Sequence, residues 1–145
     1  MNVIAAVDQN WAIGKDGDQL CYLSADLKRF QALTTGHAVI LGRKTLATFP
    51  GGRPLKNRQN LVLSRDLSFA PEGAEVFRDL DSLLAAAPAD AFVIGGERVY
   101  RALLPWCRRA VFPTLDGDPT WRLVAEEPPL EQDGLVFHYV TYERV

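Results

Sequence analysis

The chain has 145 residues, of which 48% are hydrophobic, and this suffices for one domain with a sizeable core. Its 16 basic and 18 acidic residues nearly balance and form no basic block, which argues against nucleic-acid partners and anionic membrane surfaces. No run of about eighteen apolar residues occurs, and the N-terminus lacks the basic start and long apolar core of a signal peptide. Cys21 and Cys107 match no metal spacing and suit free thiols of a reducing compartment. We therefore expect a single cytoplasmic domain over residues 1–145.

Short apolar runs alternate with helical patterns along most of the chain. After Pro113 the pattern changes to two strand-like segments, 121–127 and 135–145, which a polar connection at 128–134 joins. Strands that are apolar on both faces and separated by helices indicate a parallel sheet covered on both sides. The expected fold class is α/β, with a mixed, mostly parallel central sheet flanked by helices and an antiparallel C-terminal hairpin. We predict earlier strands at 3–7, 37–41, 60–64, 75–77 and 91–94, and helices from Ser24 to near Gly36 and at 42–49, 79–87 and 97–104.

A lone carboxylate, Asp26, lies in the first turn of the helix that Ser24 is expected to cap. An acidic side chain there complements the helix dipole by about 0.3–1 kcal/mol. At about 100° per residue, however, Asp26 falls between Phe30 and Leu33, with Leu27 on its other flank. Burial within this apolar stripe raises the pKa of a carboxyl and keeps a proton available near neutral pH. The helix pattern alone leaves both roles open, helix stabilisation and proton delivery.

Basic or glycine-rich segments follow four of the predicted strands, and in open parallel sheets ligands gather at these carboxyl ends. The turn into the 42–49 helix sets two cations and a hydroxyl beside free backbone N–H groups, which is an anion-binding arrangement. Adjacent glycines let a ligand approach the backbone closely. Together the segments predict an elongated phosphorylated ligand such as a dinucleotide, although no G-x-G-x-x-G fingerprint follows the first strand. The residues are Gly42, Arg43, Lys44, Thr45, Ser64, Arg65, Arg78, Gly95, Gly96 and Arg98.

Six segments in collinear order resemble the dihydrofolate reductase family over roughly the first hundred residues. The resemblance implies the fold of that family, a mixed, mostly parallel sheet with flanking helices. It also implies an enzyme that reduces 7,8-dihydrofolate to 5,6,7,8-tetrahydrofolate by hydride transfer from NADPH to the pterin and protonation at N5. The segments are Ile4-Ala5-Ala6, Ile13-Gly14, 23-LSADLKRF-30, 39-VILGRKT-45, 53-RPLKNRQNLVLSR-65 and 93-VIGGERVYRALLP-105.

The resemblance also implies a role for each matching residue. Asp26 matches the single active-site carboxylate, which hydrogen-bonds the pterin and promotes its protonation. Arg58 matches the arginine that binds the α-carboxylate of the substrate's glutamate tail, a bidentate task suited to a guanidinium. Ser64, Arg65 and Arg78 lie where the 2′-phosphate is recognised, which favours NADPH over NADH. No metal is implied. The implied substrate contacts are Ile4, Ala6, Leu27, Phe30, Phe49, Leu55, Arg58, Ile94 and Tyr100, and the cofactor contacts are Ala6, Ile13, Gly14, Gly42, Arg43, Lys44, Thr45, Ser64, Arg65, Arg78, Gly95, Gly96 and Arg98.

The chain departs from the family pattern in two places. Cys21 stands where the family usually has Trp, and Ser24 stands where it usually has Pro. Segment 105–121 is also short, because the family has there a strand, whose Thr hydroxyl hydrogen-bonds the catalytic carboxylate, and then a long acidic loop. We predict that residues 110–115 fill this strand, with Thr114 near Asp26. The alternative is a first strand at the sheet edge, or a neighbour supplied by another chain in a domain swap.

Three activities stay open at this point. The first is dihydrofolate reduction in one-carbon metabolism, by a monomer or a domain-swapped dimer that acts on a small-molecule substrate. The second is a catalytically impaired NADPH- or pterin-binding relative, which the short segment suggests. The third is a same-fold pyrimidine reductase of riboflavin synthesis, which is disfavoured because Asp26, Phe30 and Arg58 suit a pterin with an acidic tail. His37 and His138 show no partner spacing, and we interpret both as structural or exposed.

Overall fold

The computed structural model describes residues 1–5, 14–15, 18–19, 24–111, 119–132 and 134–145. Their contacts form two compact units. The first unit consists of Met1 and Thr34–Trp106, and the second of Asn2–Leu33 and Cys107–Val145. The single domain expected from the chain length stays a prediction. None of the helices in the described ranges has the length and apolar character needed to cross a membrane.

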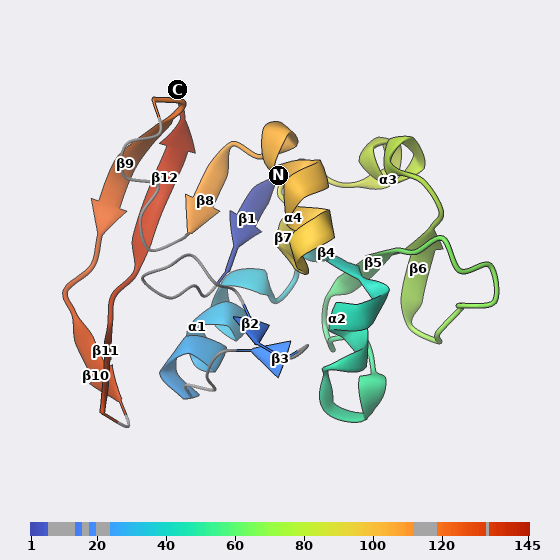
Figure 1. Ribbon diagram of the computed structural model, residues 1–145, viewed down its shortest axis with the longest axis horizontal. Coiled ribbons are helices and arrows are strands. Elements are labelled where there is room, and N and C mark those ends of the chain that lie inside the picture. Colours follow the sequence, from blue (N-terminus) through green and yellow to red (C-terminus); the bar gives the residue numbers. More distant parts are fainter. Residues whose placement is uncertain (6–13, 16–17, 20–23, 112–118, 133) are drawn as a thin grey trace. The chain divides into compact units, whose positions relative to one another are not determined.

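The first unit, all of whose residues are described, is a parallel sheet with short helices. Its strands lie in the order β6-β5-β4-β7 (Figure 1). α2 packs against β4, α3 against β5 and β6, and α4 against β7 and β4. The strands are β4 (Ala38–Gly42), β5 (Gln59–Leu63), β6 (Ala74–Phe77) and β7 (Phe92–Gly95), and the α-helices are α2 (Arg43–Ala47), α3 (Leu80–Ala86) and α4 (Glu97–Leu103), with 3₁₀ turns η1 (Pro50–Gly52) and η2 (Leu104–Trp106).

The central strands of this unit form its core because they are apolar on both faces. Ile40, Leu41, Leu61 and Val62 are fully buried. Each such side chain contributes about 1.5–3 kcal/mol relative to an exposed position. The edge strand β6 instead leaves one position exposed, Glu75. The core therefore fixes the strand ends, on which the site below is built.

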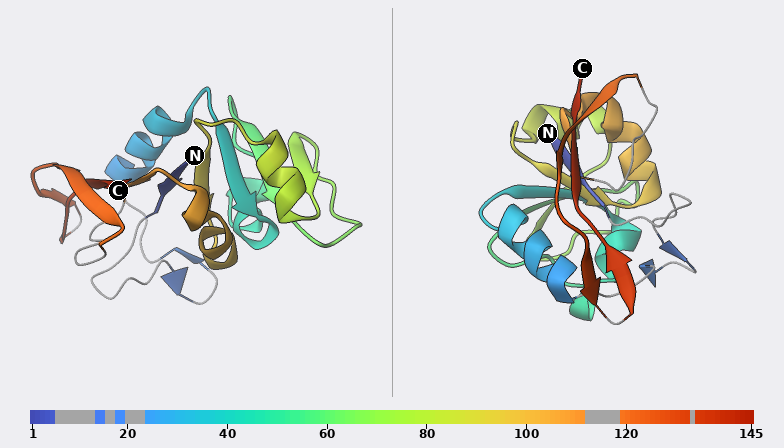
Figure 2. Two further views of the ribbon diagram at one scale, coloured as in Figure 1. Left: turned by 90° about the horizontal axis from the view of Figure 1, so that it is seen from above. Right: turned by 90° about the vertical axis from the view of Figure 1, so that its left-hand side faces the viewer.

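The second unit combines helix α1 (Ser24–Thr34), up to Leu33, with a mixed sheet. Its described strands lie in the order β1-β8-β12-β9, in which β1 and β8 are parallel and the other pairs antiparallel. The antiparallel pair β9 and β12 continues into the pair β10 and β11. We call these four strands the C-terminal ribbon, and Figure 2 shows it as one long band. The strands are β1 (Asn2–Ile4), β8 (Arg109–Val111), β9 (Trp121–Glu126), β10 (Leu130–Gln132), β11 (Leu135–Phe137) and β12 (Val140–Arg144), with a small pair β2 (Gly14–Lys15) and β3 (Asp18–Gln19).

Each helix and strand predicted before Pro113 is present, with ends shifted by no more than three residues where they are described. Two predictions near the C-terminus were wrong. Segment 135–145 is not one strand but two, and the polar connection 128–134 contains strand β10. The reason is a local hairpin, because Gly134 adopts a φ of +79° that suits a tight turn and lets β10 pair with β11.

The shortened segment keeps its strand. β8 pairs with β1 on one side and with β12 on the other, so the first strand has a neighbour from its own chain. This confirms the prediction for the start of 110–115, whereas Thr114 lies outside the described residues. Cys107, which precedes β8, is buried, and burial raises the pKa of its thiol to about 11. Cys21 lies outside the described residues.

Candidate functional site

The four strands of the first unit end level with one another. Gly42 at the end of β4 pairs with Leu63 at the end of β5, and Leu63 pairs with Phe77 at the end of β6. Leu41 pairs with Gly95, the last residue of β7. Since neighbouring strands lie about 4.8 Å apart, the row of ends spans roughly 14 Å. We call this row, with the residues that follow each strand, the carboxyl edge. It brings together the features that the sequence placed after four separate strands.

Two helices begin at the carboxyl edge without a side-chain cap. Gly42 precedes α2 and Gly96 precedes α4, and neither N-terminus has a side-chain cap within this fully described unit. Helix α3 differs, because the Asp79 carboxylate accepts a hydrogen bond of 2.8 Å from the Ser82 N–H. The first N–H groups of a helix have no partner inside the helix, so the uncapped starts of α2 and α4 are the places on this edge that suit an anionic ligand.

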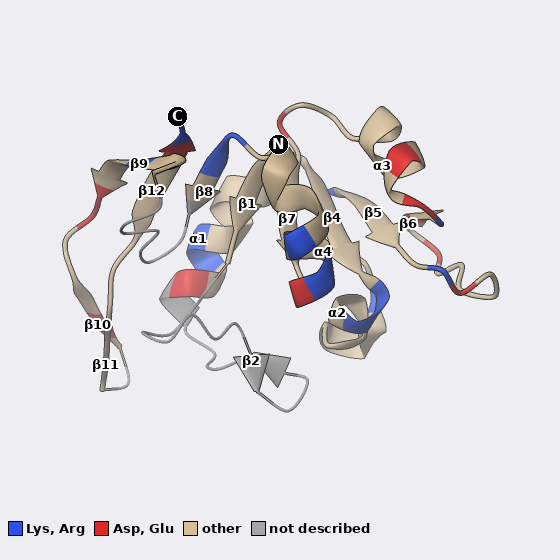
Figure 3. Ribbon diagram, turned by 45° about the horizontal axis from the view of Figure 1, so that its top comes forward, with Lys and Arg blue, Asp and Glu red and all other residues tan. Residues whose placement is uncertain are grey.

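Cationic side chains accompany these two helix starts. Lys44, Arg65 and Arg98 are exposed. Arg43 is exposed too, and its guanidinium lies 3.1 Å from the Asp66 carboxylate. Figure 3 shows basic residues at the start of α2 and within α4. The carboxyl edge therefore combines uncapped helix starts with positive charge, an arrangement that suits a ligand with phosphate groups.

Arg78 has a different environment from the other cations. Its guanidinium donates to the backbone carbonyls of Ser64, Asp66 and Phe69, the last at 2.9 Å. It also reaches the carbonyl of Leu67 at 3.5 Å. These contacts hold the loop after β5 in place. They indicate a structural role for Arg78, while its predicted contact with the cofactor stays a prediction.

The paired glycines after β7 fit closely against Thr45 of α2. A Cβ atom on Gly95 would lie 3.3 Å from Thr45 Cγ2, and one on Gly96 would lie 3.0 Å from Thr45 Oγ1. Gly95 also has a φ of +144°, which side-chain-bearing residues rarely adopt. The peptide bond between the two glycines is cis. The sequence therefore requires glycine here for a close approach of the backbone to α2.

Arg58 is held in place by neighbours in the first unit. Its Nε donates to the Lys56 carbonyl at 2.9 Å and its Nη1 to the Thr34 hydroxyl at 3.0 Å. The buried Asn60 amide shapes the same loop, accepting from the Leu55 N–H at 2.9 Å and donating to the carbonyls of Leu55 and Arg58. Burial lowers the pKa of Arg58, which nevertheless stays cationic. The guanidinium is thus preorganised for a carboxylate. Sequence reasoning missed Asn60.

The other predicted substrate contacts of this unit are half-buried apolar groups and one tyrosine. Phe49, Leu55 and Ile94 are half-buried. The Tyr100 hydroxyl lies 3.7 Å from the point where a Cβ of Gly95 would lie, and burial raises the pKa of Tyr100. This places Tyr100 beside the glycines of the carboxyl edge.

In the second unit, Asp26 occupies the first turn of α1. Its carboxyl is half-buried, and this burial raises its pKa, while Tyr139 and Arg29 lower it to a lesser extent. The direction is the one that the sequence predicted for a proton-delivery group. Leu27, at 47% exposure, and the half-buried Phe30 follow on the same helix.

Two groups that act on Asp26, Arg29 and Tyr139, were absent from the sequence-based site, as was Glu127, which contacts both of them. Arg29 forms an ion pair with Glu127, and Tyr139 faces the carboxyl. Arg29 and Glu127 are 98 residues apart in the chain, so no local spacing reveals their contact. Among the remaining predicted residues, Ile4 lies in β1 and Gly14 in β2, whereas Ala6 and Ile13 lie outside the described residues.

The two histidines have partners that spacing did not reveal. His37 Nδ1 lies 3.0 Å from the Asp90 carboxylate, and its ring meets Phe92 edge to face. His138 Nε2 lies 3.6 Å from a Glu126 oxygen. Both are half-buried, which agrees with the structural interpretation.

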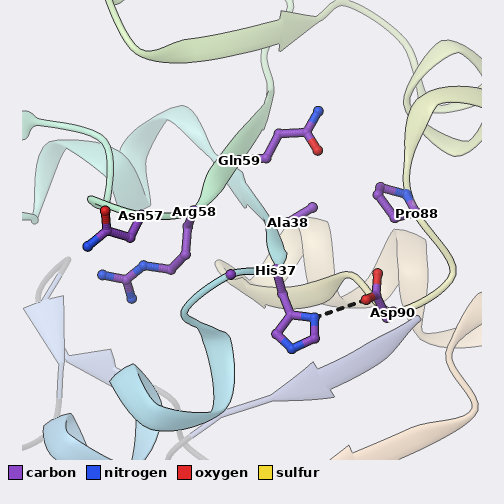
Figure 4. Close-up of a pocket in the computed structure, with 8 residues that line it drawn as sticks. His37, Ala38, Asn57, Arg58, Gln59, Pro88 and Asp90 are labelled. Atoms are coloured by element: carbon purple, nitrogen blue, oxygen red, sulfur yellow. Dashed lines mark hydrogen bonds and ion pairs between the residues drawn. The ribbon is translucent and has the colours of Figure 1, made fainter.

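A cavity of about 240 Å³ lies beside His37, at the amino ends of β4 and β5, away from the carboxyl edge. Figure 4 shows His37 turned toward Asp90, with the Arg58 guanidinium directed away from that pair. The cavity therefore belongs to the edge of the sheet opposite to the carboxyl edge. Its lining residues are Gly36, His37, Ala38, Asn57, Arg58, Gln59, Pro88 and Asp90.

Comparison with known proteins gives a consistent result. The family described as "Dihydrofolate reductase" matches residues 1–144 of the chain. A dihydrofolate reductase of Mycobacterium leprae is 35% identical over 161 aligned positions, covering 99% of this chain and 98% of the relative. One of Bacillus subtilis is 33% identical, covering 99% and 94%. Both alignments exceed the 145 residues of the chain, so the relatives contain positions that this chain lacks.

Among solved structures, a dihydrofolate reductase from Enterococcus faecalis complexed with NADP(H) superposes with a TM-score of 0.82. It is 32% identical, and the match covers 99% of this chain and 95% of the other. A score of this size over almost the whole chain confirms the predicted fold class.

Proposed function

The chain belongs to the dihydrofolate reductase family, and we propose that Asp26 is the group through which it promotes protonation of its substrate. The protein is an NADPH-dependent oxidoreductase that reduces dihydrofolate to tetrahydrofolate. Of the activities left open by the sequence, the comparisons therefore favour the first. The observation that carries the role of Asp26 is its half-buried carboxyl with a pKa raised by burial.

NADPH, when bound, supplies the hydride that the pterin accepts. We assign its phosphates to the carboxyl edge, where the α2 and α4 starts offer backbone N–H groups. Lys44 and Arg98 add positive charge there, and Ser64 with Arg65 are assigned to the 2′-phosphate. Gly95 and Gly96 allow the close approach, and Ala6, Ile13 and Gly14 keep the nicotinamide-side role that the resemblance implies.

Asp26 acts on the pterin side. A hydride acceptor must become electrophilic, and a proton at N5 of the pterin achieves this. Burial disfavours the carboxylate form, so the Asp26 carboxyl holds a proton at a higher pH than an exposed aspartate does. The step needs one proton donor, and we assign that task to Asp26 alone.

The remaining contacts orient the substrate. Arg58 receives the α-carboxylate of the glutamate tail, because its guanidinium is already fixed by Lys56 and Thr34. The apolar contacts bury the ring systems, and the tyrosine lies on the nicotinamide side. These are Ile4, Ala6, Leu27, Phe30, Phe49, Leu55, Ile94 and Tyr100.

The test is NADPH consumption with dihydrofolate, measured from acid to alkaline pH for wild type and Asp26→Asn. We expect the variant to lose about 10²–10⁴-fold in turnover at neutral pH, the usual contribution of a positioned acid. Part of the activity should return at low pH, where the substrate is protonated by solvent. Wild-type turnover that falls at high pH, together with an equally active variant, would remove Asp26 from the mechanism. Tight NADPH binding without wild-type turnover would instead indicate an impaired relative.

We also propose that the protein acts in the cytoplasm as a monomer, without nucleic-acid or membrane partners. Its nearly balanced charge supports this proposal, as does the pairing of β1 with β8 of the same chain. Sedimentation of the purified protein tests the oligomeric state. A stable dimer would contradict the monomer.

A further inference from the structure

Arg29 links α1 to the C-terminal ribbon of the same unit. It lies one turn after Asp26, and its guanidinium makes two contacts with the Glu127 carboxylate, Nη2–Oε1 at 2.6 Å and Nη1–Oε2 at 2.9 Å. The guanidinium carbon also stands 4.0 Å from the centroid of the Tyr139 ring. Two parallel contacts and a stacked ring define the position of a guanidinium closely.

The Tyr139 ring is held on other sides as well. The Glu127 N–H donates to the Tyr139 carbonyl at 2.9 Å, which fixes the backbone where β11 gives way to β12. The Phe137 ring meets the Tyr139 ring edge to face, with centroids 5.8 Å apart. The direction of the Tyr139 hydroxyl is therefore set by the fold and not by solvent.

That hydroxyl has an unused donor. Its oxygen is buried, and none of the described residues lies in hydrogen-bonding geometry with it. A buried polar group without a partner is unfavourable, so its presence calls for an acceptor. Asp26 lies one turn before Arg29 on α1, its carboxyl is half-buried, and the Tyr139 ring stacks on that same Arg29. The Asp26 carboxyl is therefore the acceptor that we assign to this hydroxyl, and the mutual effect of the two groups on their pKa values agrees with the assignment.

We propose that Tyr139 is a positioning residue for Asp26, its hydroxyl donating a hydrogen bond to the carboxylate while the stacked Arg29 holds its ring. This inference rests on the function proposed for Asp26 above. Within the described residues, the groups that face the Asp26 carboxyl are Arg29 of its own helix and Tyr139 of the ribbon. Glu127 acts on both through its contacts with Arg29 and the Tyr139 backbone.

The contact has a consequence for the chemistry. A donor to the charged form favours the carboxylate and opposes the effect of burial. Tyr139 thus keeps the pKa of Asp26 below the value that burial alone would give. An acid works best when its pKa is near the working pH, so this balance allows Asp26 to hold and also to release its proton.

The test is the variant Tyr139→Phe, which keeps the ring, the Arg29 stack and the Phe137 contact. We expect the midpoint at which activity falls with rising pH to move upward by about one pH unit, because the carboxylate loses a donor. The same shift is expected without turnover, in an NMR titration of the Asp26 side-chain carbonyl carbon. Tyr142→Phe, which removes another hydroxyl from the ribbon, is the matched control and should leave both midpoints in place.

Two further measurements separate the possible failures. An unchanged Asp26 titration in folded Tyr139→Phe protein overturns the positioning role, whatever the activity shows. If Asp26→Asn keeps the full pH profile of the wild type, the proposed role of Asp26 fails, while the NMR titration still decides whether the hydrogen bond exists. The double variant with Arg29→Gln should shift the titration by less than the sum of the single variants, since one residue holds the other. Strict additivity would contradict the part assigned to Arg29.

Discussion

The two units arrange their candidate functional residues in opposite ways. The carboxyl edge of the first unit is made mainly of backbone, at the level ends of four strands and the uncapped starts of α2 and α4. The surroundings of Asp26 in the second unit are made of side chains. Arg29 lies one turn later on the same helix, whereas Tyr139, and Glu127 that pairs with Arg29, come from a distant part of the sequence. A site made of backbone depends on the conformations that the main chain can adopt. A site made of side chains depends on which groups contact each other. Substitutions should therefore act differently in the two units.

The largest effect is expected where the backbone of the first unit least tolerates an added side chain. Gly95→Ala forces a side-chain-bearing residue to a φ of +144° and sets a Cβ 3.3 Å from Thr45 Cγ2. We expect a loss of about 1–3 kcal/mol in the free energy of unfolding from the backbone conformation alone. We also expect NADPH affinity to fall at least about tenfold, because α2 must move. Chemical denaturation and fluorescence titration with NADPH measure the two effects.

Gly36→Ala is the matched control for that variant. Gly36 has a φ of +82°, and a Cβ there has no atom of the described residues within 4 Å. It precedes β4 and so lies at the opposite edge of the sheet. The control should lose stability but keep its NADPH affinity. Equal losses of affinity in the two variants would show that the carboxyl edge is not the cofactor edge.

The next effect separates two roles for the arginines after β5 and β6. Arg78→Ala removes hydrogen bonds to three or more backbone carbonyls, and we expect about 2 kcal/mol less stability. Its affinities for NADPH and NADH should fall together, because the whole loop loosens. Arg65→Ala should lower the affinity for NADPH about tenfold or more and leave that for NADH unchanged, since only NADPH has a 2′-phosphate. Selective loss of NADPH in Arg78→Ala would instead make Arg78 a phosphate ligand.

In the second unit the prediction concerns how the free energy of unfolding depends on pH. Burial raises the pKa of folded Asp26 above the ordinary 3.8, so the folded state binds a proton that the unfolded state has lost. The stability due to that proton is fully present below pH 3.8 and is lost as the pH rises through the folded pKa. Asp26→Asn avoids this loss, and we expect it to unfold at higher denaturant than wild type at neutral pH. The difference should shrink on acidification. A less stable variant at neutral pH would show that the carboxylate is well paired.

The same contrast explains how much the sequence predicted. Features after separate strands, such as Gly42 and Gly95, were assigned to one edge because parallel strands bring their carboxyl ends together. Asp26 was found from helical periodicity, which is also local. Tyr139 and Glu127 were missed because they meet Arg29 of α1 only through the tertiary fold. The break between β11 and β12 was missed since an apolar run does not reveal that a hairpin forms within the preceding connection.

The smallest effect is expected at the amino ends of the first unit's strands, where His37 pairs with Asp90. The two side chains are 38% and 64% exposed, and the pair carries opposite charges only when the imidazole is protonated. Exposed pairs contribute less than about 1 kcal/mol, so Asp90→Asn should change stability by no more than that. NADPH affinity and the KM for dihydrofolate should stay as in the wild type. Arg58 lines the same cavity but is fixed by Lys56 and Thr34, so the loss of Asp90 leaves its guanidinium in place. A raised KM in Asp90→Asn would show that the substrate tail reaches this cavity.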